Sequence, residues 1–159
     1  MDKQKLIETV CLQLEKDLST LKDAARATHE AATSEESKPE NQYDTRAIEA
    51  SYLAEAQAKR VLEIEEQLGI FKSISLKEFA PHDSIAPLAL VETTCNGKRS
   101  FILLMMKGGG LSFRFESQSV LTITPHSPLG EALIGLKAGD IAEVENGDHV
   151  HEYKIISVC

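Results

Sequence analysis

Acidic side chains gathered between positions 30 and 44 are the residues of this sequence best suited to chemistry. They are Glu30, Glu35, Glu36, Glu40 and Asp44. Carboxylate oxygens are ligands that Mg²⁺ takes readily, and an acidic surface also suits a protein partner with a basic one. The simpler interpretation is a solvated polar loop whose acids favour the N-terminus of a following helix.

Other clusters of polar residues carry weaker signals. His149 and His151 would share one face of a strand, as metal ligands can, but no third ligand lies near them in the sequence. The glycine run 108–110 lacks a phosphate-binding pattern and precedes no helix, so we expect it to connect two strands. The three cysteines are scattered and give neither a disulfide framework nor a zinc signature. The sequence contains no self-sufficient catalytic set, which argues against a stand-alone enzyme.

The composition restricts the class of partner. The 159 residues carry a formal net charge of −8, and 42% of them are hydrophobic. An acidic excess argues against avid, nonspecific binding to nucleic acid, because such binding needs Lys and Arg to displace counterions. No apolar run reaches the roughly 18 residues of a membrane span, and the first residues do not form a signal peptide. We therefore expect a cytoplasmic protein without a membrane partner.

The acidic segment lies between two predicted helices. In each helix, apolar or small residues recur at alternating spacings of three and four, as the buried stripe of a helix requires. The first stripe is Ile7, Val10, Leu14, Leu18, Leu21, Ala25, Thr28 and Ala32, and the second is Tyr43, Ala47, Ala50, Ala54, Gln57, Val61, Ile64, Leu68 and Phe71. The polar residues 33–42 are predicted to form the loop between the helices. Residues 1–72 are therefore predicted to form an antiparallel helical hairpin with an acidic tip.

The two stripes also predict how the helices pair. Facing residues of an antiparallel hairpin have residue numbers with a constant sum, and seven pairs from Ile7/Leu68 to Ala32/Tyr43 share the sum 75. A single register favours a monomer whose hairpin pairs with itself. The alternatives are a dimeric coiled coil, or helices that pack on the second half. Helices of this length would extend about 40 Å.

The second half of the chain changes to the period of β-strands. Residues 73–84 are predicted to link it to the hairpin. In residues 85–159, strand candidates flank two Asn-Gly pairs, at 96–97 and at 146–147. Asn-Gly between strands is the strongest short signal of a β-hairpin, because both central residues of the tightest turn need a positive φ.

One short helix is predicted within this β-rich half. Ser127-Pro128 provides a capping side chain followed by a proline at the first helical position, and Gly135 can end the helix. A sheet packed by one short helix, preceded by a helical hairpin, makes the chain α+β.

The segment around this short helix resembles the C-terminal signature of the Gre family of transcript-cleavage factors, S-P-[IL]-G-x-A-L-[IL]-G-x-x-x-G-D. The residues that carry the resemblance are Pro125-His126-Ser127-Pro128-Leu129-Gly130-Glu131-Ala132-Leu133-Ile134-Gly135-Leu136-Lys137-Ala138-Gly139-Asp140. At the hairpin tip, Glu40-Asn41 followed by Tyr43 resembles the family's D-x-x-E-N-A-E-Y more loosely. The resemblance implies an FKBP-like fold for residues 85–159.

The resemblance also implies a function on bacterial RNA polymerase. In that family the C-terminal domain docks beside the secondary channel, the hairpin enters the channel, and tip carboxylates help hold a Mg²⁺ at the polymerase active site. The metal activates water for cleavage of backtracked RNA. Such a factor is an accessory and not an enzyme; it has no intrinsic cofactor and meets nascent RNA and DNA only through the polymerase. Carried over to this chain, the docking residues are Ser127, Pro128, Leu129, Gly130, Gly135, Gly139 and Asp140, and the metal-holding carboxylates are Glu36 and Glu40.

The tip departs from the family motif. Ser37 stands where the motif has Asp, and one residue separates Glu40-Asn41 from Tyr43 where the family has two. Three interpretations stay open. Glu36 and Glu40 converge on the metal across a loop bent by Pro39, or the factor binds the channel and regulates transcription without promoting cleavage. In the third, the chain is a coiled-coil interaction module unrelated to the polymerase.

Overall fold

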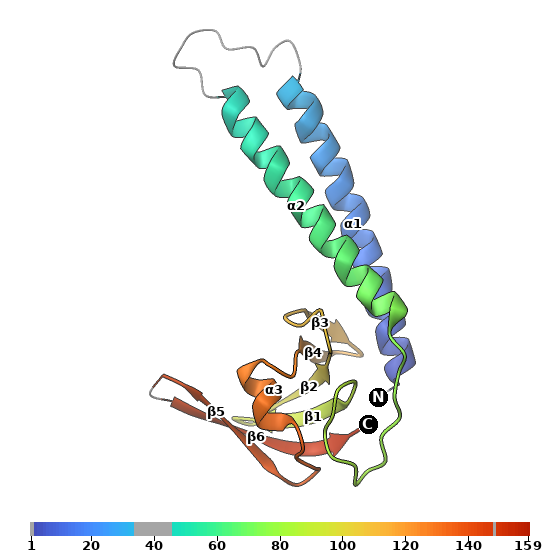
Figure 1. Ribbon diagram of the computed structural model, residues 1–159, viewed down its shortest axis with the longest axis vertical. Helices are drawn as coiled ribbons and strands as arrows, with labels where there is room; N and C mark the ends of the chain where they lie inside the picture. The colour runs from blue at the N-terminus through green and yellow to red at the C-terminus, as the bar shows by residue number, and fades with distance from the viewer. Residues whose placement is uncertain (1, 34–45, 148) are drawn as a thin grey trace. The chain divides into compact units, whose positions relative to one another are not determined.

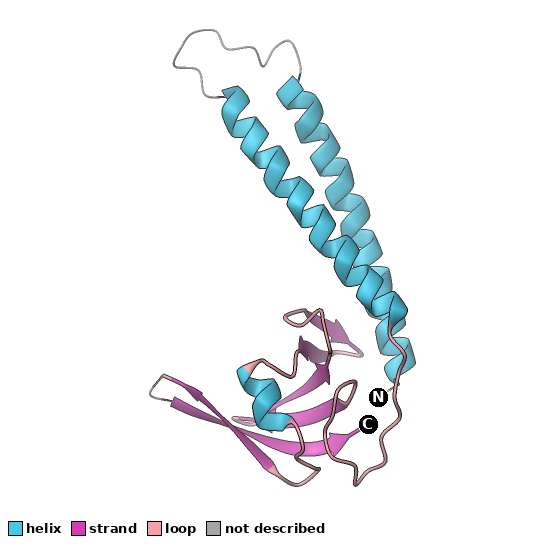
Figure 2. Cartoon of the chain, in the orientation of Figure 1, coloured by secondary structure: helices cyan, strands magenta, loops and turns pink. Residues whose placement is uncertain are grey.

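The computed structural model describes residues 2–33, 46–147 and 149–159 (Figure 1, Figure 2). Along the chain its elements are α1 (Lys3–Thr33), α2 (Arg46–Ser73), β1 (Leu90–Cys95), β2 (Lys98–Leu104), β3 (Ser112–Phe115), β4 (Gln118–Ile123), α3 (Pro128–Leu133), β5 (Ile141–Asn146) and β6 (His149–Val158). They form two compact units, Glu8–Ser73 and Met1–Ile7 with Ile74–Cys159. The predicted α+β class, a helical hairpin and a β-rich part with one short helix, is confirmed. None of the described helices is long and apolar enough to cross a membrane.

The hairpin unit buries the stripes that the spacing predicts. Helices α1 and α2 run side by side in opposite directions (Figure 1). Val10 and Leu14 of α1 are buried, as are Ile64, Leu68 and Phe71 of α2. Ile7 is also buried, and the stripe members nearer the tip whose side chains are described are half-buried, whereas almost all positions between them are exposed. The two predicted stripes are therefore confirmed for the described side chains.

The predicted register of the hairpin is wrong. Two ion pairs join the helices, Lys22 Nζ to Glu65 Oε1 at 2.6 Å and Lys72 Nζ to Glu15 Oε1 at 2.6 Å. In both pairs the residue numbers add up to 87, where the predicted register requires about 75. A difference of 12 residues corresponds to about 18 Å along a helix, which is more than a lysine and a glutamate can span together.

The stripes could not select the register because their spacing repeats. A stripe whose spacings alternate between three and four residues repeats every seven residues, or two helical turns. Registers with sums of 82 and 89 therefore face stripe with stripe as well as the predicted one does, for example through Leu21/Val61 or Leu21/Leu68. The two ion pairs between the helices exclude the predicted sum of 75.

The second unit is built on a six-stranded sheet with the order β3-β4-β2-β1-β6-β5. All neighbouring strands are antiparallel except β2 and β4, which are parallel. The β1–β2 turn contains Asn96 with φ 50° and Gly97 with φ 74°. These are the two positive φ values that the Asn-Gly pair predicts for a tight hairpin turn.

Both faces of the sheet are partly buried, since Leu90, Leu103 and Val120 lie on the face opposite the main apolar cluster. The buried members of that cluster come from five strands, from the loop before β1 and from α3; they are Ile85, Ala89, Val91, Ile102, Leu104, Ile123, Leu133, Ala142, Ile155 and Val158. Leu133 is the residue that α3 contributes, and it is fully buried. The short helix is therefore fixed to the sheet through its apolar side.

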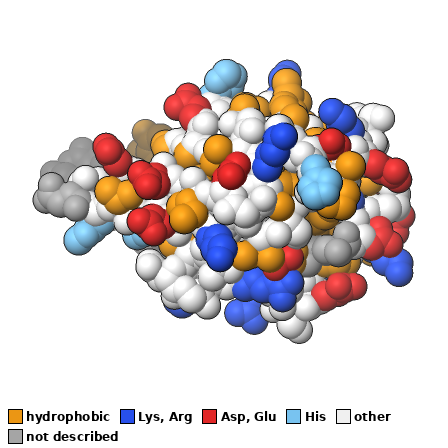
Figure 3. Space-filling view, turned by 90° about the horizontal axis from the view of Figure 1, so that it is seen from below, with side chains coloured by type: hydrophobic (Ala, Val, Ile, Leu, Met, Phe, Trp, Pro, Cys, Tyr) orange, Lys and Arg blue, Asp and Glu red, His pale blue; other side chains and the backbone are white. Residues whose placement is uncertain are grey.

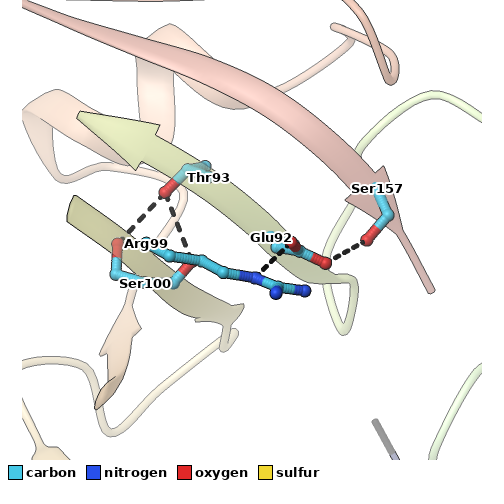
Figure 4. A network of polar contacts seen from close by, with 5 residues as sticks. All are labelled: Glu92, Thr93, Arg99, Ser100 and Ser157. Carbon is cyan, nitrogen blue, oxygen red and sulfur yellow. Dashed lines mark hydrogen bonds and ion pairs between the residues drawn. The ribbon is translucent and has the colours of Figure 1, made fainter. Parts of the chain in front are cut away.

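The central strands also hold a polar network (Figure 4). Glu92 is 8% exposed, and its carboxylate contacts Arg99 Nε at 2.5 Å and accepts a hydrogen bond of 3.0 Å from Ser157 Oγ. The hydroxyls of Thr93 and Ser100 lie 3.2 Å apart. Because a buried carboxylate without partners is costly, these contacts from β2 and β6 are what make Glu92 tolerable in β1.

The first residues of α1 belong with the β-rich unit. The Lys3 ammonium donates hydrogen bonds to the carbonyl oxygens of Lys77 and Leu88, and it lies 4.9 Å from the ring centre of Phe79. Leu6 is fully buried. Burial lowers the pKa of Lys3 from its ordinary value, although the negative charges of Cys159 and Glu78 oppose the shift.

Candidate functional site

The hairpin tip, the first candidate site, lies outside the described residues. Glu36 and Glu40 both fall in the segment 34–45, as do Glu35 and Asp44. On the described part of the hairpin, Glu30 forms an ion pair with Arg26 at 3.4 Å. Among the described residues of the whole chain, no group of three or more His, Cys, Asp or Glu side chains could hold a metal ion.

The second candidate site is the segment around α3, which begins with the predicted cap. Ser127 precedes the helix with φ −77° and ψ 152°, and Pro128 takes the first helical turn. The Ser127 hydroxyl accepts a hydrogen bond of 3.1 Å from the Gly130 N–H and donates one of 2.8 Å to the Thr124 carbonyl. The cap therefore satisfies a helix N–H and fixes the helix to the end of β4.

Gly130 is required by the close approach of the preceding loop. A Cβ at this position would lie 2.0 Å from the carbonyl oxygen of Thr124. The neighbouring Leu129 packs against the core cluster, and Leu133, three residues after Gly130, is buried in it, so both hold the helix to the core. At Gly130 the signature glycine thus permits a helix to begin directly beneath a strand end.

The C-terminal end of α3 is fixed to a distant loop. Ile134 caps the helix, and Gly135 follows with φ 83°. The Gly135 N–H donates to the Ile85 carbonyl at 2.9 Å, and the Ile85 N–H donates to the Leu136 carbonyl at 2.8 Å. The predicted helix end is confirmed, and its positive φ explains the glycine.

Gly139 and Asp140 shape the turn that leads into β5. Gly139 has φ 100°, and its N–H donates to the Ile155 carbonyl at 2.9 Å. The Asp140 carboxylate accepts a hydrogen bond of 2.8 Å from the Lys137 N–H. These residues connect the short helix with the β5–β6 hairpin.

The signature residues thus stabilise the local structure around α3, and other residues of this segment face solvent. Gly130 is buried, and the Ser127 hydroxyl forms hydrogen bonds within the chain. The exposed face of α3 consists of Pro128, Glu131 and Ile134, spaced by three residues. Ile134 is 41% exposed, and sequence reasoning missed it. The spacing between Pro128 and Ile134 could have indicated this exposure, because it places Ile134 on a different side of the helix from the buried Leu133.

The paired histidines do not gather further ligands. His149 lies opposite Asn146 and His151 lies opposite Val144, so both side chains are on one face of the β5–β6 hairpin, as predicted. Within the residues that the structure describes, they belong to no group that could hold a metal ion. His149 is exposed and His151 is half-buried.

The C-terminal part of the chain is a small domain with a mixed β-sheet. Its short helix begins at the Ser-Pro cap, ends before Gly135 and is followed by Gly139-Asp140, which lead into the last β-hairpin. Residues 115–159 match the family model described as transcription elongation factor GreA/GreB, C-terminal. This part of the chain is therefore similar to the GreA/GreB C-terminal domain, and the Gre-type resemblance of the motif is confirmed there. A search of curated proteins finds no match for the sequence.

Several solved structures resemble the chain at a distance. The GreA factor homolog 1 (Gfh1) of Thermus thermophilus is 17% identical, with 94% of each chain covered and a TM-score of 0.38. Gfh1 of Thermus aquaticus is 18% identical, covering 92% of this chain and 91% of that one, with a TM-score of 0.40. A GreA/GreB factor from Nitrosomonas europaea is 16% identical, covering 68% of this chain and 88% of that one, with a TM-score of 0.37. Similarities at this level support no further conclusion.

Proposed function

We propose that the chain is an accessory transcription elongation factor that binds bacterial RNA polymerase. The proposal rests on the GreA/GreB C-terminal match over residues 115–159. The α3 segment supports it, because Ser127 caps the helix and Gly130 permits the close approach of the Thr124 carbonyl. The helical hairpin supports it, because two helices joined by their own ion pairs form a thin rod about 40 Å long.

The docking surface in this proposal is the exposed face of α3. Pro128, Glu131 and Ile134 present an apolar patch with one acid, and the cap and the core hold this face in a fixed orientation. The residues carried over from the family motif (Ser127, Leu129, Gly130, Gly135, Gly139 and Asp140) act on docking by positioning this surface. Pro128 alone belongs to both sets.

The tip in this proposal lends carboxylates to the polymerase. Glu36 and Glu40 would be ligands of a Mg²⁺ that the polymerase supplies, and that ion would activate water for hydrolysis of the phosphodiester bond of backtracked RNA. The second candidate is a factor that binds the channel and regulates transcription without cleavage. Ser37 in the place of the motif's Asp favours this candidate, because serine cannot replace a carboxylate as a charged ligand.

Binding is tested with purified core RNA polymerase. The full chain should be retained on immobilised polymerase, and Ile134→Lys should abolish retention while leaving the circular dichroism spectrum unchanged. Leu62→Lys, at an exposed apolar residue of α2 (64% exposed), is the matched control for an added charge. A parent chain that is not retained sinks the proposal in favour of an unrelated interaction module.

Cleavage is tested with a stalled, backtracked elongation complex and Mg²⁺. The metal role is supported if the parent chain stimulates RNA cleavage and this stimulation is lost in Glu36→Gln and in Glu40→Gln. Glu30→Gln should retain it. Retention on the polymerase with uncut transcripts at saturating factor selects the second candidate. Cutting that survives both tip substitutions shows that the assigned carboxylates are wrong.

A further inference from the structure

The free edge of the sheet at β5 carries a surface that the proposed docking face does not use. Strand β5 is the last in the order β3-β4-β2-β1-β6-β5. The Ile155 N–H donates to the Asp140 carbonyl at 2.9 Å, so residues 140 and 155 form a hydrogen-bonded pair of the ladder. Because such pairs alternate in antiparallel strands, the backbone groups of residues 141, 143 and 145 point away from β6.

The side chains of the same three residues lie on the exposed face of the β5–β6 hairpin. Cross-strand partners share a face, which gives three rungs: Ile141 with Lys154, Glu143 with Glu152, and Glu145 with Val150. Ile141 is 52% exposed and Val150 is 57% exposed. Figure 3 shows hydrophobic and acidic side chains intermixed toward the left of the view. We call these six residues the β5 edge surface.

The charges of the β5 edge surface are not balanced within the chain. Glu143 and Glu152 lie directly opposite each other, an arrangement that destabilises a strand pair. Among the described residues, neither of them nor Glu145 has an ion-pair partner. With one lysine against three glutamates, the surface has a net charge of −2.

We propose that the β5 edge surface binds an extended basic segment of another protein, which adds to β5 as a further strand. The outward N–H and C=O groups of residues 141, 143 and 145 supply the main-chain hydrogen bonds. The side chains specify the partner, which has Lys or Arg facing Glu143 and Glu145 and an apolar residue facing Ile141. A second copy of this chain is disfavoured, because pairing β5 with itself brings like charges together.

The probe is a synthetic antiparallel strand, acetyl-Thr-Lys-Thr-Lys-Thr-Val-Thr-amide, added to the ¹⁵N-labelled full chain. We expect saturable binding with the largest amide shift changes in β5 and β6, and an affinity that falls as salt rises. Glu143→Lys should weaken binding at least about tenfold through repulsion of the peptide lysine. Glu116→Lys, an exposed position in the β3–β4 turn at the opposite edge of the sheet, should not change it.

Three further outcomes overturn the proposal. Absence of saturable binding at millimolar peptide means that the acids serve only to protect the edge from pairing. Equal affinity for a peptide N-methylated at the lysine facing Glu143 means that charge alone attracts the peptide and that no strand is added. Concentration-dependent self-association that Glu143→Lys changes means that the occupant is a second copy. The test contains no polymerase, so its result is separate from the proposed function.

Discussion

Gly130→Ala should destabilise the β-rich unit far more than an ordinary glycine substitution does. The new Cβ would lie 2.0 Å from the Thr124 carbonyl oxygen and 3.0 Å from Ser127 Oγ. Carbon and oxygen atoms that touch are about 3.3 Å apart, so α3 must move from the end of β4 by more than about 1 Å. That movement also separates the Gly130 N–H from the Ser127 hydroxyl that caps the helix.

The magnitude follows from two separate losses. Overpacking costs about 1–3 kcal/mol, and loss of a serine cap costs about 1 kcal/mol. The free energy of unfolding should therefore fall by about 2–4 kcal/mol, and the melting temperature by roughly 5–15 °C. Ser127→Ala removes only the cap and should cost about 1 kcal/mol.

Urea denaturation measures this change. The chain has no Trp and three Tyr, so Tyr153 fluorescence reports on the β-rich unit when Tyr43 and Tyr52 are replaced by Phe. The matched control is Gly69→Ala in α2, where an added Cβ meets nothing within 4 Å. It should stabilise the hairpin by up to about 1 kcal/mol. If Gly130→Ala is as stable as the parent chain, the packing argument for the signature glycine is wrong.

Three further perturbations test other parts of the fold. Lys22→Glu places two glutamates together and should lower the free energy of unfolding by about 0.5 kcal/mol. Adding Glu65→Lys should restore that stability. A double-mutant cycle that shows no coupling between the two positions would contradict the corrected register. Burial lowers the pKa of Lys3, so the folded state releases the Lys3 proton at a lower pH than the unfolded state does. The contribution of Lys3 to the free energy of unfolding should therefore rise with pH between the lowered pKa and 10.5. The denaturation midpoint of Lys3→Met should lack that rise. Gly97→Ala forces alanine to φ 74° and should cost about 1 kcal/mol by urea denaturation; an unchanged midpoint would mean that the β1–β2 turn relaxes to another type.

The sequence predicted local features well because their causes are local. The cap at Ser127, the helix end at Gly135 and the turn at Asn96-Gly97 each follow from the conformational preference of one or two residues, and each is present in the structure. The stripes of the hairpin were equally readable, since helical periodicity is a property of consecutive residues.

Features that depend on distant residues were not predictable in the same way. The hairpin register was wrong because a repeating stripe fits itself at several offsets, and only the partners of Lys22 and Lys72 distinguish them. The exposure of Ile134 depends on which side of α3 packs against the sheet, and its neighbour Leu133 has the same chemical character. The tip carboxylates Glu36 and Glu40 stay a prediction, because they lie outside the described residues.

The chain passes between its two units twice, near residue 7 and again near residue 73, since Met1–Ile7 belongs with Ile74–Cys159. A single backbone cut anywhere in the hairpin therefore produces two fragments that each keep a share of the β-rich unit. The shorter fragment holds the buried Leu6 and the Lys3 ammonium, which donates hydrogen bonds to the carbonyls of Lys77 and Leu88. A protein nicked near the bend should thus migrate as one species under native conditions and separate into two only when it is unfolded.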